Sequence, residues 1–311
     1  MTISFPELKE KWDGIDKHNE NYILASAEHP LLFHIGYNNV RQKSFVIYNT
    51  GKIESIPTSK AISAKCIKAE SGIYSLQFSL QYPSLSDVFM LLCWDLMDNS
   101  FVDVGAIETL LERYKKWQKL LQKANSSLLS TNEIKGLIGE LFFLSRSIDV
   151  YGEEIAICGW LGPDGADQDF IFADKWVEVK TVTISSDDVN ISSLQQLDRS
   201  DKGYLVVYFM DKTSSNATKA YSLTTIVKEV EEKLKSQQLK DKLWCKLAQK
   251  GCLKYQIERY SETVYRTSEE RVYKVDSTFP RLLRANVPVE VTSVKYMLSL
   301  AAIEKYRDKS L

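Results

Sequence analysis

The segment from Gly203 to Met210 constrains the fold of this chain most, because it is an unbroken run of apolar and aromatic residues. A strand that alternates apolar with polar residues can leave one face in water, whereas a continuous apolar run is typical of a strand buried on both faces. Such a strand needs other elements packed against both faces of its sheet. The sequence therefore predicts an α/β core that contains this strand.

A helix upstream of the strand is predicted from about residue 131 to Ile148. Ser130 or Thr131 can cap its first turn, with Glu133 just inside. Gly136 and Gly139 each lower helix propensity by about 1 kcal/mol. We expect glycine at these positions because the helix packs unusually close to a strand.

Glu140 lies on or beside the helix stripe that should face the sheet, where its neighbours include Leu137, Phe143 and Leu144. Burying an unpaired carboxylate costs several kcal/mol even after relaxation. A buried Glu140 therefore requires a cation, a shell of hydrogen bonds or a solvent-filled cleft. An equally weighted alternative is a helix edge position, where Glu140 would meet Lys135 or Arg146.

The segment from Asp169 to Lys180 is predicted to form a β-hairpin. A two-residue turn at 174–175 would make Asp169 face Lys180 and would place both groups on the same face as Glu178. A three-residue turn would break this alignment. The hairpin can thus gather two carboxylates and one ammonium at one end of a sheet.

Asp164 and Asp167 are rival candidates for the first acid. Asp164 follows Pro163 and lies among glycines, where aspartate is a common turn residue. Asp169 is preferred because it adjoins the predicted strand.

The pattern of the chain changes near residue 100. Aromatic and β-branched residues predict strands at 31–36, 44–48, 73–80 and 88–93, whereas helical spacing begins after residue 99. We expect an N-terminal β-rich module at residues 1–100 and a second domain at 101–311. The second domain should include a charged helix at 224–250 and a C-terminal helical and β extension that ends in a helix at 293–307.

Composition excludes several classes of protein. The net charge of -1 gives no global positive field that would indicate a polyanionic partner, so any surface that binds nucleic acid must be local. The five cysteines form no C-x-x-C pair, which argues against a structural zinc site or a disulfide framework and favours reduced thiols in a cytoplasmic protein. Only three histidines occur, all within the first hundred residues, so histidine-based catalysis has no base near the predicted core. No apolar run is long enough to span a membrane.

Five short segments resemble a bacterial family assigned to the PD-(D/E)xK nuclease superfamily. They are Gly139-Glu140, Gly159-Trp160-Leu161-Gly162-Pro163, Asp169-Phe170, Glu178-Val179-Lys180-Thr181 and Ser193-Leu194-Gln195-Gln196-Leu197. The resemblance covers about residues 135–210. It implies a restriction-endonuclease-like α/β (α+β) fold, in which helices flank a mixed central sheet and residues 101–311 form the nuclease-like domain.

The resemblance also implies roles for individual residues. Asp169 and Glu178 would bind Mg²⁺, for which Mn²⁺ can substitute, and Glu140 would support the metal from its helix. Lys180 would act on the attacking water. A glutamine in the following segment would assist, with Gln196 preferred over Gln195.

The expected function is Mg²⁺-dependent endonuclease cleavage of DNA in a restriction or phage-defence system. The alternative is a catalytically weak or inactive DNA-binding or scaffold subunit of a defence complex, and the sequence does not separate DNA from RNA as substrate. Expected partners are DNA, a second copy in a homodimer, and methyltransferase or ATPase subunits. Arg266, Arg281 and Arg284 are candidate phosphate contacts.

Overall fold

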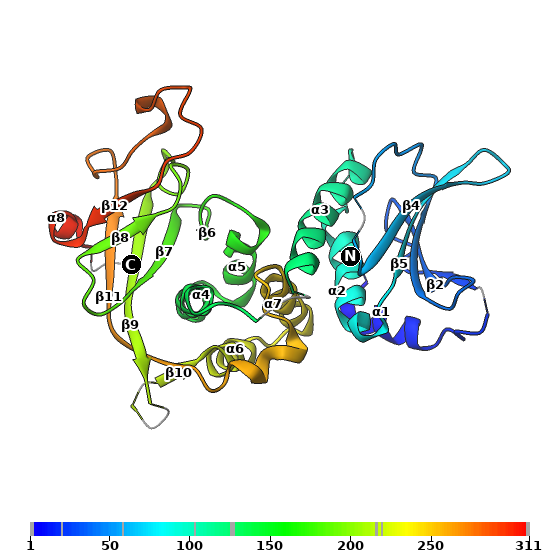
Figure 1. Ribbon diagram of the computed structural model, residues 1–311, viewed down its shortest axis with the longest axis horizontal. Helices are drawn as coiled ribbons and strands as arrows, with labels where there is room; N and C mark the ends of the chain where they lie inside the picture. The colour runs from blue at the N-terminus through cyan, green and yellow to red at the C-terminus, as the bar shows by residue number, and fades with distance from the viewer. Residues whose placement is uncertain are drawn as a thin grey trace. The chain divides into compact units, whose positions relative to one another are not determined.

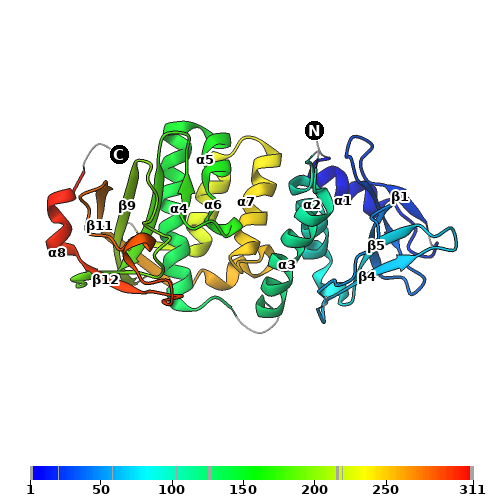
Figure 2. The same ribbon diagram turned by 90° about the horizontal axis from the view of Figure 1, so that it is seen from above.

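The computed structural model describes residues 3–19, 21–57, 59–102, 104–124, 128–214, 217–218 and 220–308, with residues 119–124 described by their backbone alone. Contacts within the chain divide it into two compact units, Met1–Leu128 and Leu129–Leu311. Figure 1 shows the elements of each unit, and Figure 2 shows them from above.

The N-terminal unit is an antiparallel sheet with helices on one face (Figure 1). Its strands pair in the order β1-β2-β3-β5-β4. They are β1 (Tyr22–Leu24), β2 (Leu32–Tyr37), β3 (Lys43–Tyr48), β4 (Ile62–Lys68) and β5 (Tyr74–Leu80). The helices are α1 (Phe5–Asp13), α2 (Ser86–Asn99) and α3 (Ala106–Ala124), with a 3-10 turn η1 at Pro83–Leu85. The strands expected at 31–36, 44–48 and 73–80 are therefore present.

The strand predicted at 88–93 is wrong, because these residues form part of helix α2. Every residue from Val88 to Met97 except Leu91 is buried. A short continuous apolar run fits a buried helix as well as a buried strand, and its length does not separate the two. Here the run forms a helix whose buried residues lie on the face of the sheet that the helices cover (Figure 1).

The N-terminal unit extends to Leu128 rather than to residue 100 because α3 is tied to α2. Asp95 on α2 accepts hydrogen bonds from Arg113 Nε at 2.6 Å and from Trp117 Nε1 at 2.6 Å. Both donors lie on α3, and Asp95 and Arg113 are buried. A buried ion pair that loses one partner costs several kcal/mol, so this network holds the two helices together.

The C-terminal unit is built on a mixed five-stranded sheet in the order β10-β11-β9-β7-β6. Its strands are β6 (Phe170–Ile171), β7 (Trp176–Val182), β9 (Gly203–Thr213), β10 (Ala220–Ser222) and β11 (Val264–Val275). β7 and β9 are parallel, and the other pairs are antiparallel. Val206 and Val207 on β9 are 0% exposed, which confirms the strand that the apolar run predicted.

Helix α4 (Thr131–Tyr151) packs against one face of this sheet. Ser130 and Glu133 form a capping box at its start, as expected. A Cβ added at Gly139 would lie 2.4 Å from Thr181 Cγ2, so glycine is what allows the helix to approach β7. A Cβ at Gly136 would meet nothing within 4 Å, so close packing does not explain that glycine.

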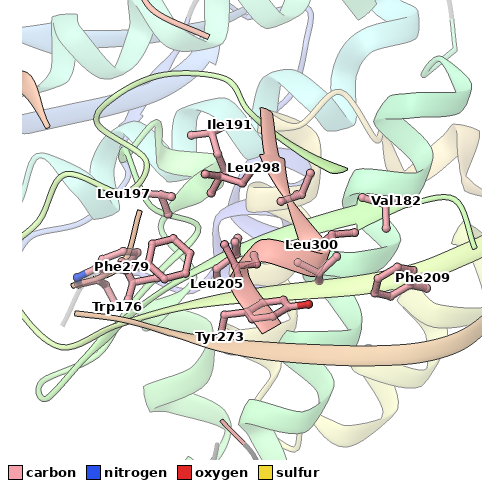
Figure 3. Close-up of a cluster of buried hydrophobic side chains, with 14 residues drawn as sticks. Trp176, Val182, Ile191, Leu197, Leu205, Phe209, Tyr273, Phe279, Leu298 and Leu300 are labelled. Carbon is pink, nitrogen blue, oxygen red and sulfur yellow. The ribbon is translucent and has the colours of Figure 1, made fainter. Parts of the chain in front are cut away.

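The opposite face of the sheet is covered by a small two-stranded sheet and a short helix (Figure 1). These are β8 (Asp188–Ile191), β12 (Tyr296–Ser299) and α8 (Leu300–Ile303). Figure 3 shows the buried side chains between these layers, among them Trp176, Leu205 and Tyr273 from the main sheet and Leu298 and Leu300 from the cover. β7 is therefore buried on both sides.

The remaining elements complete the unit. They are α5 (Glu153–Gly159), α6 (Leu223–Lys233), α7 (Gln237–Gln249), and the 3-10 turns η2 (Gly162–Asp164), η3 (Lys254–Tyr260), η4 (Arg284–Asn286) and η5 (Glu304–Tyr306). The single helix predicted at 224–250 is two helices, because the chain becomes extended at Leu234. The final helix predicted at 293–307 is mainly β12 and the short α8. No helix in the described ranges has both the length and the hydrophobicity to cross a bilayer.

Candidate active site

The hairpin between β6 and β7 brings the first two acids together. Phe172 N donates to Lys175 O at 2.8 Å and so closes a two-residue turn at 173–174. This turn lies one residue earlier than predicted. Phe170 pairs with Val177, so the register places Asp169 beside Glu178 rather than beside Lys180. The pairing is shifted by an even number of residues, which keeps the charged groups on the same face.

Glu178 lies in the middle of β7 with its side chain only 1% exposed. Its Oε1 lies 2.6 Å from Lys180 Nζ, whereas Oε2 is buried and has no hydrogen-bond partner among the described residues. Burial, followed by the negative charge of Asp169, raises the pKa of Glu178 to about 8, and the nearby Lys180 limits the increase. An unsatisfied buried carboxylate oxygen is costly unless something else binds it.

Lys180 is oriented by a second partner. Its Nζ donates to Gln196 Oε1 at 3.0 Å, and the same oxygen accepts a hydrogen bond from Ser192 N at 2.8 Å. The side chain of Gln195 is exposed, and its backbone carbonyl accepts a hydrogen bond from Gln168 Nε2. The structure thus brings Gln196, and not the side chain of Gln195, to the cluster.

Asp169 is the one of the three candidate acids that adjoins Glu178. Its Oδ2 accepts a hydrogen bond from Val179 N at 2.9 Å. Asp164 instead forms an ion pair with Lys246 at 2.5 Å, and Asp167 is exposed on the loop. The geometry therefore places Asp169, rather than Asp164 or Asp167, beside Glu178.

Glu140 approaches the same cluster from α4. Trp160 Nε1 donates to its Oε2 at 2.8 Å, and Lys250 Nζ lies 2.8 Å from its Oε1. Burial raises the pKa of Glu140, Lys250 opposes this effect, and Asp169 adds to it. The carboxylate is thus buried within a hydrogen-bonding shell that includes a cation, and its partner is neither Lys135 nor Arg146.

Lys250, which follows α7, is the main residue that sequence reasoning missed. Burial disfavours its ammonium, but Glu140, Asp169 and Glu178 together raise its pKa. Lys250 had no sequence signal that set it apart from the other lysines of a charged helix. Trp160 was part of the family-like segment, but no role was assigned to it.

A neighbouring ion pair fixes the loop that holds Trp160. Lys246 Nζ donates to Trp160 O at 2.6 Å and to Asp164 Oδ2 at 2.5 Å. Gly162 approaches the site so closely that a Cβ there would lie 2.7 Å from Asp169 Oδ1. Asp169 therefore packs directly against the backbone of Gly162 in the family-like segment.

The carboxylates of Glu140, Asp169 and Glu178 and the ammonium groups of Lys180 and Lys250 influence one another in this site, so the site carries one excess negative charge when all three carboxylates are ionised. Glu178 Oε2 has no hydrogen-bond partner within the described ranges and lies beside Asp169, which fits a divalent cation because Mg²⁺ binds through one or two carboxylates and keeps several waters. No three aspartate, glutamate, histidine or cysteine side chains in the described part of the chain are arranged to hold a metal by themselves.

Two of the expected phosphate contacts have other partners. Arg281 donates to the carbonyls of Leu197 and Arg199, and Arg284 donates to those of Pro288 and Val291. Arg281 thus ties its own segment to the loop between β8 and β9, whereas Arg284 holds residues 284–291 together. Arg266 is exposed.

The mixed sheet, the flanking helices and the acid pair beside Lys180 define a protein of the restriction-endonuclease-like class. Residues 8–301 match the model of a family described as "Putative PD-(D/E)XK family member, (DUF4420)", and the chain belongs to this family. Comparison with curated proteins and with solved structures gave no match. Family membership suggests nuclease activity.

Proposed function

We propose that the C-terminal unit hydrolyses phosphodiester bonds of DNA with the help of Mg²⁺, for which Mn²⁺ can substitute. The observation that carries this proposal is Glu178, whose Oε1 pairs with Lys180 while its buried Oε2 has no partner in the part of the chain that the structure describes. Asp169 lies beside it in the hairpin register. Two carboxylates and one ammonium in this arrangement suit a metal-assisted attack of water on phosphorus.

Asp169 and Glu178 would hold the ion. When bound, a divalent ion lowers the pKa of a coordinated water and neutralises charge that develops on the phosphoryl oxygens. Both oxygens of Glu140 already accept hydrogen bonds from Lys250 and Trp160. We therefore assign Glu140 the role of supporting the site electrostatically through Lys250.

Lys180 would orient the attacking water. Its ammonium is fixed between Glu178 and Gln196, at 2.6 Å and 3.0 Å. A lysine held at two points loses little further freedom in the transition state, which is the advantage of a preorganised charge. Gln196 acts through Lys180 and is a positioning residue.

Glu178 would release a proton when the site binds the metal ion. Its pKa of about 8 means that the carboxyl holds a proton for much of the time at neutral pH. Metal ligands must be deprotonated, so metal affinity should rise with pH up to this pKa. Calorimetric titration with Mg²⁺ in buffers of different ionisation enthalpy measures the proton released.

The test uses the purified full chain with plasmid DNA, a phage DNA and an RNA transcript. Each is incubated with Mg²⁺, with Mn²⁺ or with a chelator. We expect metal-dependent DNA cleavage that is lost in Glu178→Gln and Lys180→Met. Glu154→Gln is the matched control, because Glu154 is exposed on α5 and should leave cleavage unchanged.

Two outcomes would contradict the proposal. Wild-type protein that binds DNA but cuts none of these substrates with either metal would favour the inactive DNA-binding or scaffold subunit. Cleavage that survives in Glu178→Gln would place the chemistry elsewhere. Cleavage of the RNA transcript alone would change the substrate class.

We further propose a role in restriction or phage defence. Cutting both strands of a duplex requires two active sites, which calls for a homodimer or for assembly on neighbouring sites. Methyltransferase or ATPase subunits would be its partners in such a system. Plating phage on cells that express the wild type or Glu178→Gln tests this role, because only the wild type should protect.

A further inference from the structure

A pocket of about 490 Å³ lies in the N-terminal unit, on a sheet face that carries polar side chains. The other face of the sheet is apolar, and Phe78 there lies 4.6 Å from the ring of Tyr114 on α3. The pocket is lined by Asn38, Asn39, Val40, Gln42, Ser63, Lys65, Ile67, Gln77, Ser79 and Gln81. Amide and hydroxyl groups dominate the set, and it contains no carboxylate.

The loop between β2 and β3 forms a fixed wall of this pocket. Asn38 Oδ1 accepts hydrogen bonds from Val40 N at 3.2 Å and from Gln42 N at 2.9 Å. Arg41 has a φ of 61°, a left-handed conformation that is uncommon for a residue with a side chain. Gln42 Nε2 donates to Oε1 of Gln81, the residue that follows β5, at 3.2 Å. The wall is therefore held by its own hydrogen bonds before any ligand arrives.

The floor of the pocket presents unused hydrogen-bonding groups. Gln77 Nε2 donates to Ser44 Oγ at 2.8 Å and to Tyr22 OH at 3.2 Å, which leaves Oε1 without a donor in the described part of the chain. Lys65 lies directly across from Gln77 in the β4–β5 register and is exposed. Within the same described ranges, Lys65 forms no ion pair and Asn39 forms no hydrogen bond.

These groups select the chemistry of a ligand. Several amides call for a ligand that both donates and accepts hydrogen bonds, as the edge of a nucleobase does. Lys65 is the charged group of the lining set and calls for an anionic group, as a phosphate provides. The volume lies within the roughly 300–1,000 Å³ of ordinary ligand pockets. A nucleotide satisfies all three conditions.

The concave shape decides between paired and unpaired nucleotides. The grooves of duplex DNA are read by convex elements, a helix or a β-ribbon, that enter the groove. A hollow can take up a base only when that base is out of the stack. We propose that this pocket binds one nucleotide with an unpaired base, so that the N-terminal unit selects where nucleic acid is engaged. The inference rests on the proposed function only in taking nucleic acid as the substrate.

The test measures binding of the full chain carrying Glu178→Gln to a fluorescein-labelled, short single-stranded DNA in the presence of a chelator. Fluorescence anisotropy should show that Lys65→Gln and Asn39→Ala each weaken binding about tenfold, the effect of losing one good base or phosphate contact. Lys60→Gln is the matched control, because it removes the same charge from an exposed lysine outside the pocket. Hydrogen exchange should show that the DNA protects residues 38–42 and 74–81.

The outcomes separate this inference from the proposed function. If Lys65→Gln and Asn39→Ala bind as tightly as the Glu178→Gln background, or if a neutral glucose oligomer displaces the DNA and deoxynucleotides do not, the pocket assignment is overturned. Cleavage by the wild type would still support the nuclease in that case. If binding depends on the pocket but no substrate is cut, the pocket assignment stands and the nuclease proposal fails.

Discussion

Replacing Lys250 by methionine tests how the site tolerates a buried carboxylate. Lys250 Nζ lies 2.8 Å from Glu140 Oε1, and the Glu140 side chain is 11% exposed. Removing one partner of a buried ion pair leaves an uncompensated charge and costs roughly 3–5 kcal/mol. We expect Lys250→Met to lower the free energy of unfolding of the C-terminal unit by this amount near pH 8.

The loss should depend on pH in a defined direction. Burial already raises the pKa of Glu140, and removing Lys250 would raise it further. A carboxyl whose folded pKa exceeds its unfolded value makes the folded state bind the proton more tightly, so stability falls as pH rises from the unfolded value of 4.5 towards the folded pKa. The deficit of Lys250→Met should therefore shrink at pH 5, where Glu140 takes up a proton.

Unfolding by denaturant is monitored by hydrogen exchange of peptides from Leu129–Leu311. These peptides report the stability of the C-terminal unit separately from that of the N-terminal unit. The double variant Glu140→Gln/Lys250→Met should recover most of the loss, because replacing both partners of a buried pair is close to neutral. Lys228→Met is the matched control. Its partner Glu258 also lies 2.8 Å away, but both side chains are more than half exposed, so the cost should stay below about 1 kcal/mol.

A loss below about 1 kcal/mol in Lys250→Met at pH 8 would refute this reasoning. Failure of the double variant to recover stability would refute it too. Either result would mean that solvent or Trp160 stabilises the Glu140 carboxylate without the ammonium.

Three further predictions concern the same unit. In the metal-free protein, Glu178 binds a proton more tightly when folded, so stability should fall by up to roughly 5 kcal/mol as pH rises from 4.5 to about 8, and denaturant titrations of Glu178→Gln should lack this slope. Gly139→Ala should destabilise by about 1–3 kcal/mol because its Cβ would meet Thr181 at 2.4 Å, whereas Gly136→Ala, with nothing within 4 Å, should stabilise by roughly 0.5–1 kcal/mol; equal effects in thermal unfolding would contradict this contrast. Gln196→Ala should slow plasmid cleavage about 10- to 100-fold while calorimetry shows unchanged Mg²⁺ affinity, and a parallel loss of affinity would instead make Gln196 part of the metal site.

Local signals in the sequence determined much of the C-terminal core. The buried strand at Gly203–Met210 and the helix that begins after Ser130 depend on apolar periodicity and on a capping box, and both kinds of signal act over a few residues. The same locality explains the error at 88–93. An apolar run specifies burial, but the neighbouring elements decide between strand and helix.

Register was only partly readable from the sequence. The alternation along β7 showed that Glu178 and Lys180 share a face, because that period depends on the backbone alone. Which residue stands opposite Asp169 depends on where the turn falls, and the turn lies one residue earlier than the pattern suggested.

Only the tertiary structure decided what surrounds Glu140. Its periodicity indicated a position on the stripe facing the sheet, but Trp160 and Lys250 come from distant parts of the chain. No local pattern distinguishes a lysine that will be folded against a buried carboxylate from one that stays in water. The chain thus specifies its carboxylates by local pattern, whereas packing of α4, α7 and the loop at Trp160 determines which charges balance them.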